Sequence, residues 1–246
     1  MKINVIYIFV SILLILLLLL LLRLFTPSNK LEPVIVPENC KKYVENCIYI
    51  NLDSRTDRRN QTEEELRRIG INPMRFSAIK NKKGAIGCTM SHIKCLEIAI
   101  AYNWDYVFIC EDDIHFLDPN LFYKQLSKLV EDIYDWDVIL VAGNNKGSYE
   151  KVNDYCIKVS NCLTTTGYIV CKKYYNILLN NFRDGLNYFQ QNPSQKDDFA
   201  IDTYWKNLQI MDNWFLITPL SVIQREGYSD IEKKDVNYKK DMIREM

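Results

Sequence analysis

The chain has 246 residues, of which 31 are basic and 31 are acidic, so its formal net charge is zero. Nucleic-acid-binding proteins normally carry a basic excess that neutralises phosphates, and this balance therefore argues against nucleic acid as a partner. Hydrophobic residues make up 48% and charged residues 25% of the chain, which excludes wholesale disorder and is typical of a globular domain.

The first predicted element is a membrane-spanning helix. Residues 3–22 form an apolar stretch of 20 residues, and residues 12–22 are all Ile or Leu. At about 1.5 Å per residue this stretch is roughly 30 Å long, which matches the hydrocarbon core of a bilayer. No small-residue cleavage site follows it, so we expect an uncleaved signal-anchor over residues 1–25, with a cleaved signal peptide as the alternative.

A short stem and one folded domain are predicted to follow. The stem, residues 26–45, contains three prolines, and the domain extends over residues 46–229. Its apolar runs of strand length alternate with helical patterns, which predicts an α/β domain with a mostly parallel central sheet. We expect a solvated helix or a frayed end over residues 230–246, because ten of these 17 residues are charged. The expected strands are 47–52, 74–79, 106–110, 138–141, 165–171 and 214–217, and the expected helices 58–69, 88–102, 121–133, 173–182 and 198–208.

Eight cysteines are present, and none of them forms a Cys-x-x-Cys pair. Zinc ribbons and thioredoxin-like redox sites are therefore not expected. Cys40 and Cys47 flank the start of the folded region, and a disulfide between them is possible if that region is lumenal.

Polar groups gather where the strand at residues 47–52 ends. Asn51 lies at the end of this strand, and Arg55 and Arg58 follow it. Ligands of open α/β sheets bind at the carboxyl ends of strands, so these side chains are candidates for holding a nucleotide. A charged, N-capped helix that faces solvent explains the same residues.

Three adjacent acids follow the apolar strand at residues 106–110. Glu111, Asp112 and Asp113 repel one another and suit neither a strand nor a core, which favours a bound divalent cation. Only two histidines are present, so a three-histidine zinc site is excluded and the cation would be Mg²⁺ or Mn²⁺. An acidic turn that caps the next helix is the alternative.

Two further residues are singled out on helical patterns. His92 lies in the predicted helix 88–102, where a lone histidine is more often a hydrogen-bonded packing residue than a catalyst. Asp202 lies between apolar residues in the predicted helix 198–208, so that it faces either water or a cleft.

Taken together, these segments resemble glycosyltransferase family 25, the group of lipopolysaccharide and procollagen galactosyltransferases. Three blocks carry the resemblance: an opening strand with an Arg-rich turn at residues 48–59, a Gly-Cys-x-x-Ser-His block at 87–92 preceded by Gly84, and a hydrophobic strand ending in Glu-Asp-Asp at 107–113. Weaker similarity continues at residues 166–170, 201–202 and 219–224. Residues 81–83, Asn-Lys-Lys, depart from the connection usual in the family, which leaves substrate contacts there open.

The resemblance implies a GT-A-type fold and an enzyme that transfers a hexose, galactose in the best-known members, from a UDP-sugar to a hydroxyl group of a glycan or protein. It implies an inverting, metal-dependent reaction in which Glu111, Asp112 and Asp113 hold Mn²⁺ or Mg²⁺. Asn51, Arg55, Arg58 and His92 would bind the donor, and Asp202 would be the general base.

The resemblance also favours a type II membrane protein with a lumenal catalytic domain. The charges point the other way, because Lys2 precedes the apolar stretch and four basic residues follow it, which by the positive-inside rule favours a cytoplasmic domain. Two other functions explain the acidic triplet or the anchor: a metal-dependent nucleotidyltransferase or phosphoesterase, and an inactive, membrane-tethered carbohydrate-binding module.

Overall fold

The computed structural model describes residues 34–242 together with residues 10, 12, 13, 15 and 17. The chain divides into two compact units, Met1–Glu32 and Pro33–Met246. Among the described residues no helix combines the length and the apolar character that crossing a bilayer requires. The predicted anchor at residues 1–25 lies outside the described residues except for those five positions, so it stays a prediction.

The second unit is built on a sheet of eight strands. Three neighbouring pairs are parallel, β1 with β2, β1 with β3 and β5 with β11. β10 is antiparallel to both of its neighbours, and so is β8, which means that six of the eight strands point the same way. The predicted α/β class with a mostly parallel sheet is confirmed in this sense. In sheet order the strands are β2 (Met74–Ser77), β1 (Cys47–Asn51), β3 (Tyr106–Glu111), β10 (Gly167–Cys171), β5 (Val138–Leu140), β11 (Trp214–Ile217), β8 (Cys156–Val159) and β7 (Tyr149–Lys151).

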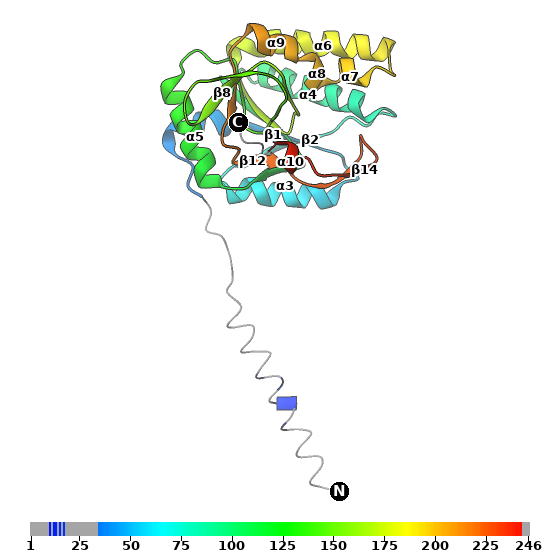
Figure 1. Ribbon diagram of the computed structural model, residues 1–246. Helices are drawn as coiled ribbons and strands as arrows, with labels where there is room; N and C mark the ends of the chain where they lie inside the picture. Colours follow the sequence, from blue (N-terminus) through cyan, green and yellow to red (C-terminus); the bar gives the residue numbers. More distant parts are fainter. Residues whose placement is uncertain (1–9, 11, 14, 16, 18–33, 243–246) are drawn as a thin grey trace. The chain divides into compact units, whose positions relative to one another are not determined.

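The central strands are apolar because helices cover both faces of the sheet. In β3 the residues from Val107 to Cys110 are fully buried, and β10 and β5 are buried along their whole length. Each fully buried large aliphatic or aromatic side chain contributes on the order of 1.5–3 kcal/mol to folding. Figure 1 shows α4 (Gly84–Ala101) and α6 (Tyr175–Gln191) above the sheet and α3 (Thr56–Arg68) below it. α5 (Pro119–Asp132) packs near β11.

Several elements differ from the sequence predictions. The helix expected over residues 198–208 is three short helices, α7 (Lys196–Phe199), α8 (Ile201–Tyr204) and α9 (Lys206–Met211). Ala200 separates α7 from α8 because its backbone is extended, with ψ 146°, and Trp205 lies between α8 and α9. The charged segment from residue 230 is not a solvated tail in its first half. Gly227–Ser229 (β13) and Lys234–Val236 (β14) form an antiparallel hairpin, and Val236 is buried. The remaining short elements are β4 (Ile114–Phe116), which pairs with β12 (Val222–Gln224), β6 (Asn144–Asn145), which pairs with β9 (Cys162–Leu163), and α10 (Lys239–Met242).

The second half of the predicted stem is part of the folded unit. The backbone N–H of Val34 donates to the carbonyl of Arg68 (3.0 Å), and α2 (Glu38–Val44) packs beside β3. Gly70 follows the end of α3 with φ +77°, and a Cβ there would approach Val36 Cγ2 to 2.8 Å. The segment around Val36 therefore passes the end of α3 at a point where only glycine fits. Cys40 and Cys47 are both buried free thiols, and no disulfide joins them.

These contacts predict where a stable fragment begins. A fragment of residues 33–246 should unfold cooperatively, whereas a fragment of residues 40–246 should be less stable by about 1–3 kcal/mol. The shorter fragment lacks the packing of Val34 and Val36 and the Pro37 carbonyl that accepts the first hydrogen bonds of α2. Urea denaturation of both fragments measures the difference. Ile35→Ser in the longer fragment is the control, because Ile35 is 88% exposed; equal stability of the two fragments would contradict the prediction.

Candidate functional site

The carboxyl ends of β1 and β3 lie next to each other at one edge of the sheet. Ile50 of β1 is in register with Glu111 of β3, and the Glu111 N–H donates to the carbonyl of Thr166 (3.0 Å) just before β10. Gly167 begins β10, and a Cβ there would approach Val141 Cγ2 to 2.7 Å and Ile114 Cδ1 to 2.9 Å, so the chain fits beside the residues that follow β5 and β3 only without a side chain. This edge is where ligands of open α/β sheets bind.

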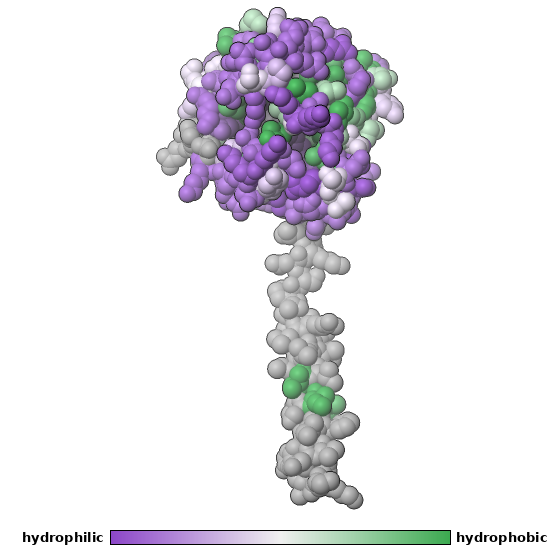
Figure 2. Space-filling model, turned by 90° about the vertical axis from the view of Figure 1, so that its right-hand side faces the viewer, coloured by the Kyte–Doolittle hydropathy of each residue, from purple (hydrophilic) through white to green (hydrophobic). Residues whose placement is uncertain are grey.

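Two cavities open at this edge and meet at Glu111. The larger cavity, about 440 Å³, is lined by the ends of β1 and β3, the start of α4 and the β13–β14 hairpin. The smaller cavity, about 260 Å³, is lined by α8 and by the turn that contains Thr164 and Thr165. Figure 2 shows the face that lies on the right of Figure 1, where mostly hydrophilic surface surrounds a hollow. Five residues line both cavities: Cys88, Glu111, Gln224, Ser229 and Ile231.

Asp112 is held by protein groups on both carboxylate oxygens. Arg58 donates to its Oδ1 (2.7 Å) and Asn51 Nδ2 donates to its Oδ2 (2.7 Å). Burial raises the pKa of Asp112, although the charge of Arg58 and both hydrogen bonds act to lower it. Asn51 is 1% exposed and belongs to the described lining of neither cavity. Its role in the structure is therefore to position Asp112.

Asp113 is the strand-end acid that has a buried carboxylate oxygen without a partner among the described residues. Its Oδ2 accepts from Gln224 Nε2 (3.0 Å) and lies 3.4 Å from Arg58 NH1. Its Oδ1 is buried and has no hydrogen-bond partner among the described residues. Burial, followed by the charge of Glu111, raises the pKa of Asp113 to about 7. A buried carboxylate oxygen without a partner is a suitable ligand for a hard cation such as Mg²⁺ or Mn²⁺.

Glu111 is bound differently from the other two acids. Its Oε1 accepts from the Thr165 hydroxyl (2.5 Å), lies 3.2 Å from His92 Nε2 and receives the Cys88 thiol at 3.5 Å. His92 is fully buried and its Nδ1 lies 2.8 Å from the Tyr168 hydroxyl, so both ring nitrogens are engaged behind Glu111. Burial opposes the charge of Glu111, but the hydrogen bonds from His92 and Thr165 outweigh it and lower its pKa.

The three strand-end carboxylates therefore do not surround one common point. Among the described residues, the side chains whose ligand-type atoms gather within 4.8 Å are Cys88, His92 and Glu111. In that group the thiol is a hydrogen-bond donor, because burial and then Glu111 raise the pKa of Cys88. The contacts of Glu111 are those of a carboxylate held by hydrogen bonds. Asp113 is the acid with a buried oxygen, Oδ1, that has no partner among the described residues.

Asp202 and Glu111 both line the smaller cavity. The backbone N–H of Thr164 donates to its Oδ2 (3.1 Å), and Thr164 adopts φ +76°, a conformation that is strained for a β-branched residue and common at functional sites. Burial raises the pKa of Asp202. Asp197 and Asp198 are exposed on α7 and are not among the lining residues of either cavity.

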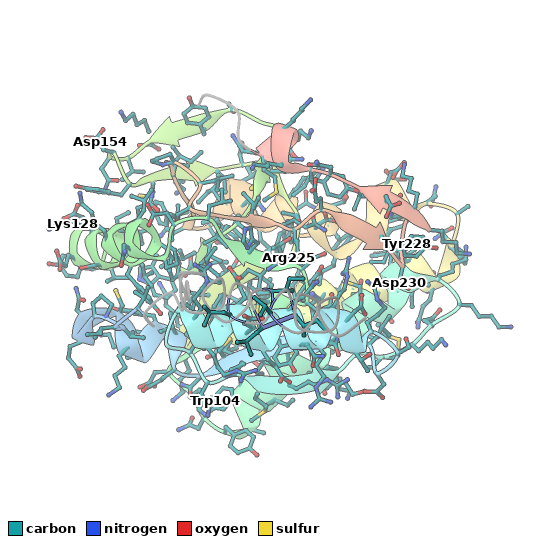
Figure 3. All side chains as sticks on the ribbon, turned by 90° about the horizontal axis from the view of Figure 1, so that it is seen from below. Trp104, Lys128, Asp154, Arg225, Tyr228 and Asp230 are labelled. Carbon is teal, nitrogen blue, oxygen red and sulfur yellow. The ribbon has the colours of Figure 1, made fainter. Side chains whose placement is uncertain are left out.

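The β13–β14 hairpin covers the two cavities and binds the predicted arginines. Arg55 donates to Asp230 Oδ2 (2.5 Å), and Arg58 NH2 donates to the Tyr228 carbonyl (2.9 Å). Lys196 and Glu232 form an ion pair on the other side of the hairpin. Tyr228 and Asp230 lie together at one end of the molecule in Figure 3. Of the two arginines, Arg58 lines the larger cavity, whereas Arg55 clamps the hairpin.

Sequence reasoning missed several residues of the site. Gln224 contacts Asp113 and lines both cavities, and Thr164 and Thr165 contact Asp202 and Glu111. Gln224 and the Thr-Thr-Thr run at residues 164–166 lie at the edges of segments that the family resemblance covers, which was the available signal. The hairpin carried no such signal, because its charged composition is that of a solvated tail.

Comparison with known proteins places the chain among carbohydrate-modifying proteins. The model of glycosyltransferase family 25 (LPS biosynthesis protein) matches residues 82–245, which is about two thirds of the chain and includes the hairpin. A Haemophilus influenzae protein whose name, given provisionally, is that of a glycosyltransferase is 29% identical to this chain over 126 residues. That match covers 48% of this chain and 43% of the relative, so the chain spans less than half of the relative's length.

Solved structures of low sequence identity align with parts of this chain. A protein from STIV has 12% identity and a TM-score of 0.43, with 78% of this chain and 93% of that chain covered. A glycosyltransferase involved in the glycosylation of the major capsid of PBCV-1 has 12% identity and a TM-score of 0.38, with 70% and 92% covered. Similarity at this level bears on neither substrate nor mechanism.

The burial of Asp113 predicts a stabilising substitution. In metal-free buffer at pH 8, Asp113→Asn should raise the free energy of unfolding by on the order of 2–4 kcal/mol. The pKa of Asp113 is raised from 3.8 to about 7 in the folded state, so the wild type loses stability as the pH rises through that interval. Toward the lower end of this interval the carboxyl group becomes protonated in both states, and the advantage of Asn should largely disappear.

Urea denaturation at pH 4 and pH 8 measures this difference. Asp154→Asn is the matched control, because it removes one acid whose side chain is 85% exposed and which lies at the opposite end of Figure 3 from Asp230. A lower stability of Asp113→Asn at pH 8 would show instead that Arg58 compensates the charge of Asp113.

Proposed function

The chain belongs to glycosyltransferase family 25, and on that premise we propose that it transfers a hexose from a UDP-sugar to a hydroxyl group of a glycan or protein. The observation that carries the proposal is the pair of cavities that meet at Glu111. Group transfer requires two substrates to be held side by side with their reacting atoms in contact. A mixed α/β sheet with polar groups at its strand ends supports a GT-A-type domain for this purpose.

The larger cavity suits the nucleotide donor. Arg58 lines it, and its guanidinium would exchange the contact with the Tyr228 carbonyl for one with a phosphate, a group that arginine forks commonly bind. Polar groups of the segment that precedes α4, including those of Lys80, Asn81 and Lys82, line the same cavity and are available to the rest of the nucleotide. The volume of about 440 Å³ is within the range usual for small-molecule sites.

A divalent cation, Mn²⁺ or Mg²⁺, is part of the proposal. Asp113 fits as its ligand, because Oδ1 is buried without a partner among the described residues and the residue lines the larger cavity. When bound, such a cation stabilises the charge on a departing diphosphate. Asp112 contributes by fixing Arg58 beside the same phosphates, since both of its own oxygens are already occupied.

The smaller cavity suits the acceptor, with Asp202 as the general base. Inversion requires a base on the side of the sugar opposite to the leaving group, and Asp202 is separated from the larger cavity by the residues that the two cavities share. The raised pKa of Asp202 supports this role, because a base works best when its pKa approaches the working pH. The Thr164 N–H fixes the orientation of the carboxylate.

The donor sugar and the location of the protein belong to the same proposal. The resemblance to the best-known family members supports galactose as the hexose. The apolar stretch at residues 3–22 supports a single-pass anchor. The family resemblance supports a catalytic domain in the lumen, although the flanking charges favour the opposite orientation.

Binding of UDP should depend on Mn²⁺ or Mg²⁺ and on Asp113. Calorimetric titration of the wild type with UDP should show binding that chelation of the metal weakens at least tenfold, and Asp113→Asn should remove this cation dependence. Asp154→Asn should behave as the wild type. Cleavage of a UDP-sugar to UMP and a sugar 1-phosphate, or turnover of other nucleotides or phosphodiesters without any sugar acceptor, would favour a nucleotidyltransferase or phosphoesterase. Cation-dependent affinity that is undiminished in Asp113→Asn would reject the ligand assignment.

Asp202→Asn should reduce turnover by about 10²–10⁴-fold, the usual contribution of a general base. The affinity for UDP and for the cation should hardly change, because the substitution lies on the acceptor side. Asp198→Asn is the control, since Asp198 is exposed on the neighbouring helix. Steady-state turnover with a UDP-sugar and acceptor panel measures both variants. Turnover of Asp202→Asn within a few-fold of the wild type would reject the role, and a loss in Asp198→Asn alone would move it there.

A further inference from the structure

The carboxylate of Glu111 is asymmetric in its contacts. Three donors converge on Oε1, namely Thr165, His92 and Cys88. Among the described residues no donor contacts Oε2. The side chain is nevertheless 21% exposed, so one oxygen is saturated by the protein and the other is available to a ligand.

The position of Glu111 limits which part of a ligand Oε2 can meet. Glu111 is one of the five residues that line both cavities. In a transfer reaction the anomeric carbon of the hexose must face the departing diphosphate on one side and the acceptor hydroxyl on the other. The group that lies at the junction of the two cavities is therefore the transferred sugar.

We propose that Glu111 is a sugar-binding residue that determines hexose specificity: Oε2 accepts hydrogen bonds from hydroxyl groups of the transferred hexose. This inference rests on the proposed function and assigns Glu111 a role different from the cation ligand that the sequence predicts. A carboxylate fixed through one oxygen is well suited to the task, because it loses little freedom when its second oxygen binds. Hydroxyl groups that fail to meet it leave a charged acceptor unpaired, which penalises the wrong epimer.

The alternative of a cation ligand fits Glu111 less well than Asp113. Asp113 lines the larger cavity and has a buried oxygen without a partner among the described residues, whereas three donors already hold Oε1 of Glu111. A softer cation such as Zn²⁺ held by Cys88, His92 and Glu111 would need the thiolate, whereas this thiol donates a hydrogen bond.

His92 and Tyr168 are positioning residues in this arrangement. Tyr168 lies in β10, holds Nδ1 of His92 at 2.8 Å and is itself fully buried, so the imidazole cannot turn away from Glu111. His92 therefore acts on a substrate through Glu111 and does not contact it.

The test is calorimetric binding of UDP and of a panel of UDP-hexoses that differ at single hydroxyl groups, all with Mn²⁺. Glu111→Gln should bind UDP within about threefold of the wild type. The additional affinity that the preferred hexose gives over UDP should fall about tenfold or more, as expected when a hydrogen bond to a charged group is lost. Preference among the hexoses should fall with it.

Two further variants separate sugar binding from structural damage. Thr165→Val removes one donor to Oε1 in nearly the same volume and should reduce hexose preference while UDP binding stays unchanged. Tyr168→Phe removes the outer hydrogen bond to His92 and should have the same effect to a smaller degree. Asp154→Asn is the control and should retain the full hexose preference.

Three results would overturn the assignment of Glu111 and leave the proposed function standing. Loss of cation-dependent UDP binding in Glu111→Gln would make Glu111 a cation ligand. Unchanged hexose preference in Glu111→Gln would remove it from the sugar site, and stoichiometric Zn²⁺ binding that both Glu111→Gln and Cys88→Ser abolish would make the group a soft-metal site. A wild-type protein that binds neither UDP nor any UDP-hexose would overturn the proposed function itself, and the assignment with it.

Discussion

The arrangement of the site depends on how three adjacent carboxyl groups are accommodated at the end of a buried strand. Charges this close repel one another, and burial adds a desolvation cost to each. The protein meets this by giving each acid a different environment. Asp112 pairs with Arg58, Glu111 is fixed through one oxygen by hydrogen bonds from His92 and Thr165, and Asp113 keeps a buried oxygen without a partner among the described residues. The oxygens of Glu111 and Asp113 that the described residues do not contact are thus the part of the cluster that is left for ligands.

Much of the fold follows from the sequence because the central strands are apolar throughout. The strands β1, β3, β5 and β11 and the helices α3, α4 and α5 were predicted to within a few residues. α6 extends nine residues beyond its predicted end at residue 182, and the helix predicted over residues 198–208 is divided into three. The reversed directions of β10 and β8 were not predictable, because an apolar run has the same pattern in either direction. The short strands β4 and β12 pair across more than 100 residues, and the pairing, not local propensity, makes them strands.

The candidate site was predictable in composition but not in the role of each residue. Asn51, Arg58, His92 and the three acids do converge at one edge, as the strand-end rule implies. Their division into residues that face a cavity and residues that stand behind others depends on side-chain contacts over 19 to 61 positions along the chain. No spacing rule predicts such contacts. Gln224 and the Thr164 turn were missed for the same reason, since neither carries a charge that would mark it.

The hairpin explains why the two predicted arginines are not equivalent. Arg55 is paired with both Asp57 and Asp230, so a phosphate could reach it only by displacing one of two carboxylates. Arg58 is bound to Asp112 and to a backbone carbonyl of the hairpin, and the loss of a carbonyl contact costs less than the loss of an ion pair in a partly buried place. A diphosphate in the larger cavity therefore meets Arg58 first. Arg55 contributes by holding the hairpin over the cavities. The hairpin shields the charges at the strand ends from water. Because water is excluded, every electrostatic contact that a ligand makes there is strengthened.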